Sequence, residues 1–313
     1  MPPKRKTISP IDLSSTAAKP VVINIAPSDL AWLCGMDHYN NLAKCLCKIW
    51  KQVGADTFKQ VRSQVEAANG YTAVDSAQKQ IAAIQARHVH TGGERVDVLS
   101  GIKAINADKA KSSGELVTAQ ATLAQKVAQT GMDQATQAQM TRLLTSATNV
   151  MHGVHNENDG LAIFTKATGH AVTQTQGPVR GLLYRDPVSG VEWRLNGKFD
   201  GLAANGDLVE VKNRQKGLFR RLRDYEECQI QTYLGMLEIN KCHLVEVYKA
   251  TGGQVEYNVI PVARRPEYMS AVIQPWIEKA ARFMGVLAGD PTLMSEVMAG
   301  DTNGRVRDIY NAQ

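Results

Sequence analysis

Two turn sequences that separate short β-rich segments constrain the fold of this chain more than any other feature. The turn Asp-Pro-Val-Ser-Gly at 186–190 separates residues 181–185 from residues 191–199, and Asn205-Gly206 leads into residues 208–212. Asn-Gly and Pro/Gly-containing turns between alternating apolar and polar residues are typical of antiparallel hairpins. The sequence therefore predicts a three-stranded antiparallel meander.

The residues after the meander predict a helix, two more strands and further helices. A helix is expected over residues 218–239, strands are expected over 243–248 and 255–260, and the chain from Pro266 onward has a helical pattern. Strands mixed with helices in this way predict an α/β (α+β) fold.

The N-terminal residues divide into a tail and a short helical part. Residues 1–20 hold four prolines and the Lys4-Arg5-Lys6 cluster, so we expect a disordered basic tail. The cluster is interpreted as a nuclear localisation signal, as a nucleic-acid arm or as a merely solubilising charge. Residues 21–65 are expected to form the N-terminal helical part, in which Ser28 caps a first helix and a second helix covers 41–53.

Residues 66–150 differ in composition from the rest of the chain. They are rich in Ala, Gln, Thr and Ser, and Tyr71 is their one aromatic residue. Their diluted helical periodicity predicts a helical insertion with a small core of its own, broken at Gly92-Gly93 and at residues 112–114. Residues 151–313 then form the remaining unit.

Composition limits the function without assigning it. The chain has 313 residues, 43% of them hydrophobic, a formal charge of +6 and a pI near 9.0. The mild basic excess is compatible with a polyanionic partner but does not demonstrate one. No apolar run approaches the roughly 20 residues that span a bilayer, and no secretory signal is present, so we expect a soluble intracellular protein without a membrane partner.

The five cysteines, Cys34, Cys45, Cys47, Cys228 and Cys242, match neither a disulfide framework nor a zinc or iron–sulfur site. We interpret them as reduced, mostly buried thiols. The pairs His88/His90 and His152/His155 could each bind a metal, but solvated or capping histidines are far commoner.

Asp200, Glu210 and Lys212 form the set of residues best suited to catalysis. Asp200 ends the second predicted strand, and Glu210 and Lys212 lie two apart on the third, so their side chains leave the same face. Two carboxylates, with a backbone carbonyl such as that of Val211, make an oxygen site of the kind that Mg²⁺ or Mn²⁺ prefers. Lys212 could then position an attacking hydroxide and offset charge on the phosphorane. The alternative is an exposed strand face with ordinary solvated charges.

Three further residues are expected near this site. Gln229 and Tyr233 lie at i and i+4 on the helix after the third strand, so they share one face. Glu157 is placed in the first turn of a helix that opens at residues 156–159, where it either supplies a further carboxylate or complements the helix dipole.

The order of these residues resembles the PD-(D/E)XK nuclease superfamily, in particular its lambda exonuclease and YqaJ-type viral recombinase family. The resemblance covers roughly residues 22–52 and 153–248, and it is carried by Ser28 to Met36, Gly197 to Gly201, Leu208 to Arg214 and Gln229 to Tyr233. It implies a restriction-endonuclease-like core, in which a mixed central sheet is flanked by helices. It also implies that Glu157, Asp200, Glu210 and the Val211 carbonyl bind the metal, that Lys212 is catalytic, and that Gln229 and Tyr233 support the site.

The resemblance extends to the substrate and the partners. Ser28 would help to place a DNA end, and the basic residues after the third strand would contact phosphates, unless they are a solvated helix start: Arg214, Lys216, Arg220, Arg221 and Arg223. Double-stranded DNA with free ends is the implied substrate. A single-strand annealing protein and further copies of the chain are implied partners.

The sequence therefore predicts a Mg²⁺-dependent exonuclease that resects double-stranded DNA ends by two-metal phosphodiester hydrolysis, for recombination, replication or genome processing. A structure-specific endonuclease, such as a junction resolvase, is the alternative enzyme. A catalytically silent DNA-binding or packaging module is the alternative from another class.

Overall fold

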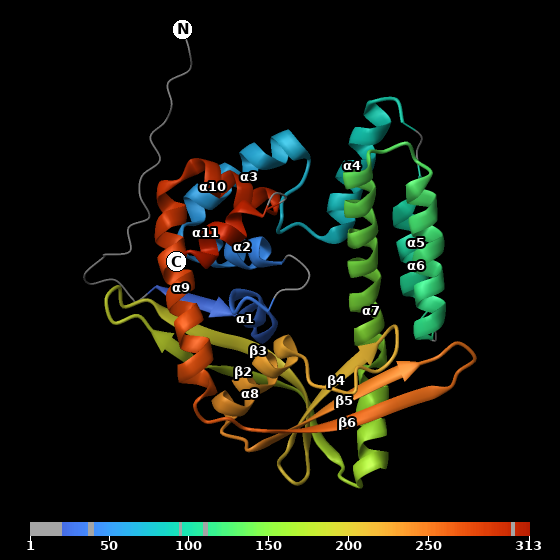
Figure 1. Ribbon diagram of the computed structural model, residues 1–313, viewed down its shortest axis with the longest axis vertical. Coiled ribbons are helices and arrows are strands. Elements are labelled where there is room, and N and C mark those ends of the chain that lie inside the picture. Colours follow the sequence, from blue (N-terminus) through green and yellow to red (C-terminus); the bar gives the residue numbers. More distant parts are fainter. Residues whose placement is uncertain (1–20, 37–40, 94–95, 109–111, 302–303) are drawn as a thin grey trace.

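A computed structural model describes residues 21–36, 41–93, 96–108, 112–301 and 304–313 of the chain. The predicted tail, with Lys4-Arg5-Lys6, lies outside these residues. The centre of the fold is a mixed six-stranded sheet with the order β1-β3-β4-β5-β6, and β2 pairs with β3 off this path (Figure 1). The strands are β1 Val22–Ile25, β2 Val172–Arg185, β3 Glu192–Ala203, β4 Leu208–Arg214, β5 Lys241–Lys249 and β6 Val255–Ala263.

The predicted meander is confirmed, because β2 pairs antiparallel with β3, and β3 pairs antiparallel with β4. The structure adds two parallel pairs, since β1 lies along the start of β3 and β4 lies along β5. The four-residue β1 was not predicted, because a strand this short has too little alternation to be recognised. The pairing of β3 with β4 is brief: only Gly201 with Val209 and Leu202 with Leu208 are in register. Beyond these pairs the two strands separate.

Helices from both ends of the chain pack on one face of the sheet and form the main core. This core contains Trp50, Trp193, Phe283 and Tyr310, all buried. Figure 1 shows the N-terminal helices side by side with the C-terminal ones, and α10 contacts both α2 and α3. The helices are α1 Pro27–Leu33, α2 Leu42–Val53, α3 Ala55–Asn69, α8 Asp224–Leu237, the π-helix η1 Met269–Ile273, α9 Gln274–Gly289, α10 Pro291–Ala299 and α11 Arg305–Asn311.

Residues 77–168 form four helices: α4 Ala77–His90, α5 Val98–Ala107, α6 Ser113–Ala128 and α7 Gln134–Thr168. A separate apolar cluster that includes Ile81, Ile102 and Leu144 holds them together. The 35-residue α7 runs through position 150, where the sequence placed a boundary, and its C-terminal half packs Leu161 and Phe164 on the sheet. One continuous helix therefore belongs both to the inserted helices and to the sheet layer (Figure 1).

Two further features of the fold concern the cysteines and the length of the helices. All five cysteines lie in the described residues; each is buried and none is in a disulfide, as the sequence predicted. Among the residues that the structure describes, no helix is long and apolar enough to cross a membrane.

Candidate active site

The candidate site lies where β3 and β4 separate. One carboxylate oxygen of Asp200 on β3, Oδ2, accepts the backbone N–H of Val211 on β4 at 2.8 Å, and so replaces a strand partner. In a strand the N–H and C=O of one residue point to the same side. The Val211 carbonyl is therefore directed toward the Asp200 side of β4 and away from β5. Asp200 and this carbonyl face the gap between the two strands.

Glu210, Lys212 and Gln229 form a closed set of hydrogen bonds beside Asp200. Lys212 Nζ donates to Glu210 Oε1 at 2.8 Å and to Gln229 Oε1 at 3.1 Å, and Gln229 Nε2 donates to the same Glu210 oxygen at 2.8 Å. Glu210 and Lys212 share a face of β4, and Gln229 reaches them from α8, whose helical pattern places it in the second turn. The structure thus brings together four of the residues that the sequence singled out.

The second carboxylate oxygen of Glu210 has no such partner. Glu210 is only 2% exposed, and its Oε2 atom is buried and accepts no hydrogen bond from the described residues. A buried carboxylate oxygen without a donor is costly, and a bound cation is one of the ways in which proteins compensate it. This oxygen is the observation that best fits a metal ion.

The charges of the site suit a bound cation. Burial raises the pKa of Asp200 to about 6, against the opposing effect of Lys212, and raises the pKa of Glu210 to about 7. Burial alone would lower the pKa of Lys212, but Glu210 and Asp200 together raise it above its usual value. Two carboxylates compete for one lysine, so the site has an excess of negative charge when both are ionised. A divalent cation would stabilise the ionised forms.

Asp200, Glu210 and the Val211 carbonyl could hold a hard cation such as Mg²⁺. No group of three or more His, Cys, Asp and Glu side chains gathers for a metal within the described residues. Glu157 in particular accepts a hydrogen bond from the Gln176 side chain, and reaches the site only through its charge, which adds to burial in raising the pKa of Asp200. The expectation that Glu157 begins a helix is wrong, because it lies within α7.

Tyr233 supports the backbone beside the site. Its hydroxyl donates to the Lys198 carbonyl at 2.5 Å, two residues before Asp200 on β3. Gly197 is needed at the same point, because a Cβ there would lie 2.7 Å from Pro27 Cδ and 3.2 Å from the Tyr233 hydroxyl. Pro27 at the start of α1 and Tyr233 on α8 therefore both pack against β3 close to Asp200.

Ser28 lies beside this contact but does not cap α1. The N-cap residue is Ala26, Pro27 occupies the first turn, and Ser28 is exposed. Pro27 takes the first helical position because its missing N–H would be unpaired there in any case. The predicted capping role of Ser28 is wrong.

The basic residues after β4 divide into one buried arginine and several exposed side chains. Arg214 is 7% exposed and pairs with Glu226 at 2.6 Å and Glu246 at 2.7 Å, so the predicted phosphate contact by Arg214 is wrong. The two glutamates lie 12 and 32 residues away in the sequence, and no local pattern identified them.

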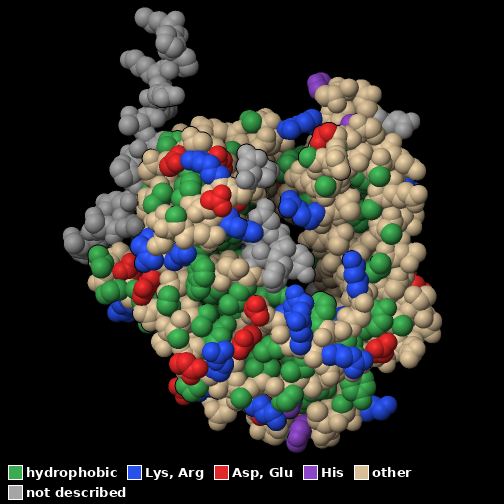
Figure 2. Space-filling view, viewed as in Figure 1, with side chains coloured by type: hydrophobic (Ala, Val, Ile, Leu, Met, Phe, Trp, Pro, Cys, Tyr) green, Lys and Arg blue, Asp and Glu red, His purple; other side chains and the backbone are tan. Residues whose placement is uncertain are grey.

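Of the remaining basic residues, Arg223 is the N-cap residue of α8, whereas Lys216, Arg220 and Arg221 precede the helix, which begins at Asp224. Lys216, Arg220 and Arg221 are exposed and Arg223 is half-buried. On the face shown in Figure 2, Lys and Arg side chains are dispersed among acidic and uncharged ones and do not form a single patch.

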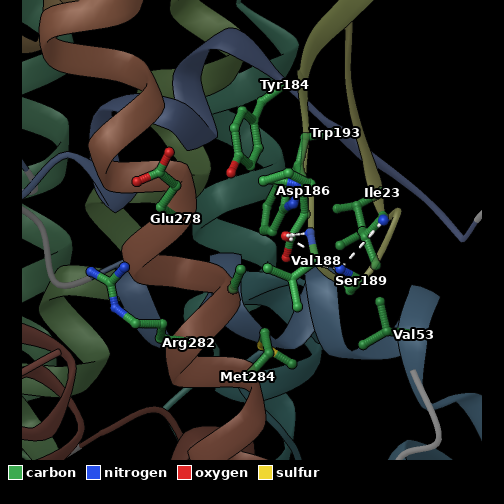
Figure 3. A pocket seen from close by; sticks show the side chains of 13 residues that line it. Ile23, Val53, Tyr184, Asp186, Val188, Ser189, Trp193, Glu278, Arg282 and Met284 are labelled. Carbon is green, nitrogen blue, oxygen red and sulfur yellow. Dashed lines mark hydrogen bonds between the residues drawn. The ribbon is translucent and has the colours of Figure 1, made fainter. Parts of the chain in front are cut away.

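A separate cavity of about 480 Å³ lies at the other end of β3 (Figure 3). The β2–β3 turn, Trp193 on β3 and Glu278 and Arg282 on α9 line it. Trp193 precedes Asp200 by seven residues, which is roughly 23 Å along a strand. None of Asp200, Glu210 and Lys212 lines this cavity, so the candidate site is a gap between strands and not the large pocket.

Comparison with solved structures gives distant matches, three of which are described here. No protein-family model matches the sequence, and no curated protein matches it. The crystal structure of an alkaline exonuclease from Laribacter hongkongensis has a TM-score of 0.32 and 16% identity, over 58% of this chain and 88% of that chain. Its complex with dAMP has a TM-score of 0.33 and 16% identity, over 60% and 88%. The protein SSO0001 has a TM-score of 0.33 and 14% identity, over 48% of this chain and 64% of that chain. Similarity at this level does not assign a function.

Proposed function

We propose that this chain is a metal-dependent DNA nuclease whose site is formed by Asp200, Glu210, Lys212 and Gln229. The observation that carries the proposal is the unpartnered Glu210 Oε2, which lies beside Asp200 and a lysine fixed in place by two acceptors. A purely structural ion pair normally satisfies every buried carboxylate oxygen, whereas Glu210 Oε2 has no donor and Asp200 adds a second negative charge beside it. The set suits phosphodiester hydrolysis, in which a metal and a cation stabilise a phosphorane.

Each side chain has a defined part in this chemistry. Asp200, Glu210 and the Val211 carbonyl would hold Mg²⁺, with Mn²⁺ as a substitute. When bound, the metal would supply Lewis acidity to the scissile phosphate and lower the pKa of water. Lys212 remains protonated at neutral pH, because Glu210 and Asp200 raise its pKa, so it would offset negative charge that develops on the phosphate. Gln229 fixes the orientation of both Glu210 and Lys212.

The proposed substrate is duplex DNA, attacked from its ends. Exposed arginines next to the site would contact the phosphate backbone and confer no sequence preference. End resection by such an enzyme would serve recombination, replication or genome processing, and hydrolysis would follow the two-metal scheme, with Glu157 recruited as a further ligand. In the present geometry Glu157 would first have to leave Gln176.

The test uses end-labelled linear duplex and closed circular duplex, each incubated with Mg²⁺ and with EDTA. The proposal predicts that linear duplex is consumed only with Mg²⁺ and that an intact circle persists. The variants Asp200→Asn and Lys212→Ala should be inactive, whereas Asp186→Asn, a matched change in the β2–β3 turn, should keep activity. Efficient cutting of the circle would indicate an endonuclease instead. Cleavage by Asp200→Asn at the parental rate would refute the assignment of the site.

A further inference from the structure

The β4–α8 loop, residues 215–223, is held more tightly than an exposed connection requires. The backbone N–H groups of Phe219 and Arg220 both donate to the carboxylate of Glu246, at 3.2 and 2.9 Å. Arg220 has a φ of 55°, a left-handed conformation that is strained for a non-glycine residue. Strain of this kind persists only where neighbouring groups impose it. Here the two hydrogen bonds from the loop backbone to the Glu246 carboxylate impose it.

Glu246 is a fully buried residue of β5, and its carboxylate contacts this loop, β4 and the neighbouring strand β6. Its carboxylate also accepts from Arg214 Nε at 2.7 Å and from the Asn258 amide at 3.3 Å. Arg214 lies two residues after Lys212 on the same face of β4. The network therefore ties the loop to the strand that carries the proposed catalytic lysine.

The side chains that the loop presents suit a polyanion. Lys216, Arg220 and Arg221 are exposed, and Arg220 lies 3.6 Å from the carboxylate of Glu256. Phe219 is 43% exposed, and the guanidinium groups of the buried Arg214 and the half-buried Arg223 lie 4.3 and 4.8 Å from the centre of its ring. Exposed cations on the same loop as an exposed aromatic ring are the combination that nucleic-acid grooves use.

We infer that Glu246 is a positioning residue, which fixes the β4–α8 loop so that Arg220, Arg221 and Phe219 contact the backbone of a DNA substrate entering the site. The inference rests on the proposed function, because a phosphodiester substrate gives these exposed cations their partner. Glu246 itself touches no substrate. Its carboxylate acts through the two backbone N–H groups and through Arg214.

The test compares Glu246→Gln with Glu192→Gln. Glu192 is a matched control, since it is 3% exposed and also pairs with two arginines, Arg185 and Arg194, but at the far end of β3. Affinity for duplex DNA is measured by titration in EDTA at several salt concentrations, so that cleavage does not interfere. Glu246→Gln should weaken binding and reduce the slope of log affinity against log salt by about 1.8 if both arginines lose their phosphates. Glu192→Gln should leave the slope unchanged.

A second variant keeps the inference testable if Glu246→Gln does not fold. Glu246→Asp retains the charge that compensates Arg214, but its shorter side chain cannot reach both N–H groups, so the salt slope should again fall. KM for DNA should rise in this variant while kcat at saturating DNA stays close to that of the parent. An unchanged slope and KM would show that Glu246 only stabilises the fold.

The two hypotheses fail in different ways. A parent chain that cleaves DNA, with Glu246 variants that bind it normally, refutes the positioning role alone. A parent chain that never cleaves DNA, with a salt slope that depends on Glu246, refutes the nuclease and keeps the loop as a nucleic-acid contact.

Discussion

Replacing Glu210 by Gln changes the shape of the site little but removes a buried charge. Glu210 is 2% exposed, and burial raises its pKa from 4.5 to about 7, with Asp200 adding to the rise and Lys212 opposing it. One pKa unit corresponds to about 1.4 kcal/mol, so ionisation of Glu210 at pH 8 costs the metal-free fold on the order of 3 kcal/mol. Asp200 is raised in the same direction, to about 6, and the two carboxyls interact, so their effects are not additive.

The sign of the pH dependence follows from the raised pKa. An acid whose pKa is higher in the folded state contributes stability that is fully present below its unfolded pKa, here near 4.5, and that is lost as the pH rises through about 7. Without a divalent cation the parent should therefore lose on the order of 3 kcal/mol from this group between about pH 4.5 and pH 8. Glu210→Gln should not show this loss, and above pH 7 it should be more stable than the parent.

The assay is urea unfolding at about pH 5 and about pH 8, in EDTA and in Mg²⁺. Mg²⁺ should stabilise the parent much more at the higher pH, because it binds the ionised carboxylates, and it should stabilise Glu210→Gln little at either pH. Glu192→Gln is the control, because Arg194 and Arg185 hold the pKa of Glu192 below its usual range and the variant should lose stability at pH 8. A parent and a Glu210→Gln variant with the same pH dependence would refute the conclusion that burial controls this carboxyl group.

Three further substitutions test separate parts of the structure. Lys212→Ala should abolish cleavage while gel-shift affinity for duplex DNA stays near the parental value, because Lys212 acts within the site and not on the exposed loop. Gly197→Ala should lower the free energy of unfolding, measured in urea, by about 1–3 kcal/mol, because its Cβ would lie 2.7 Å from Pro27. Arg214→Met should cost about 3–5 kcal/mol in the same assay, because it leaves Glu226 and Glu246 buried without their cation.

The parts of the fold that the sequence predicted are those governed by local chemistry. The Asn205-Gly206 turn and the turn at 186–190 set the meander, and the alternation of Leu208 to Lys212 set the face of β4 that carries Glu210. β1 could not be predicted in this way, since its four residues are a strand only because β3 lies beside them. The long α7 also escaped prediction, because its two halves pack on different partners and show no common apolar stripe.

The helix start after β4 was predicted too early for a related reason. Residues 218–223 have a composition that a helix tolerates. The backbone N–H groups of Phe219 and Arg220 donate instead to Glu246, and these hydrogen bonds keep the segment in a non-helical conformation. The acceptor comes from β5, more than 20 residues later in the sequence. Tertiary hydrogen bonds thus outweighed helix propensity, which differs by less than about 1 kcal/mol between most residues.

Arg214 and Lys212 show why the roles in such a site cannot be read from spacing. Glu210, Lys212 and Arg214 are at alternate positions of β4, so pattern alone gives the three side chains the same face and nothing more. Lys212 meets one glutamate that keeps an oxygen without a partner, whereas Arg214 meets two glutamates that receive further donors, among them the N–H groups of the loop. The first arrangement leaves negative charge for a cation, and the second is saturated. What separates a candidate metal site from a structural ion pair on this strand is therefore the count of donors around each carboxylate, and those donors arrive from α8, β5 and the loop between β4 and α8.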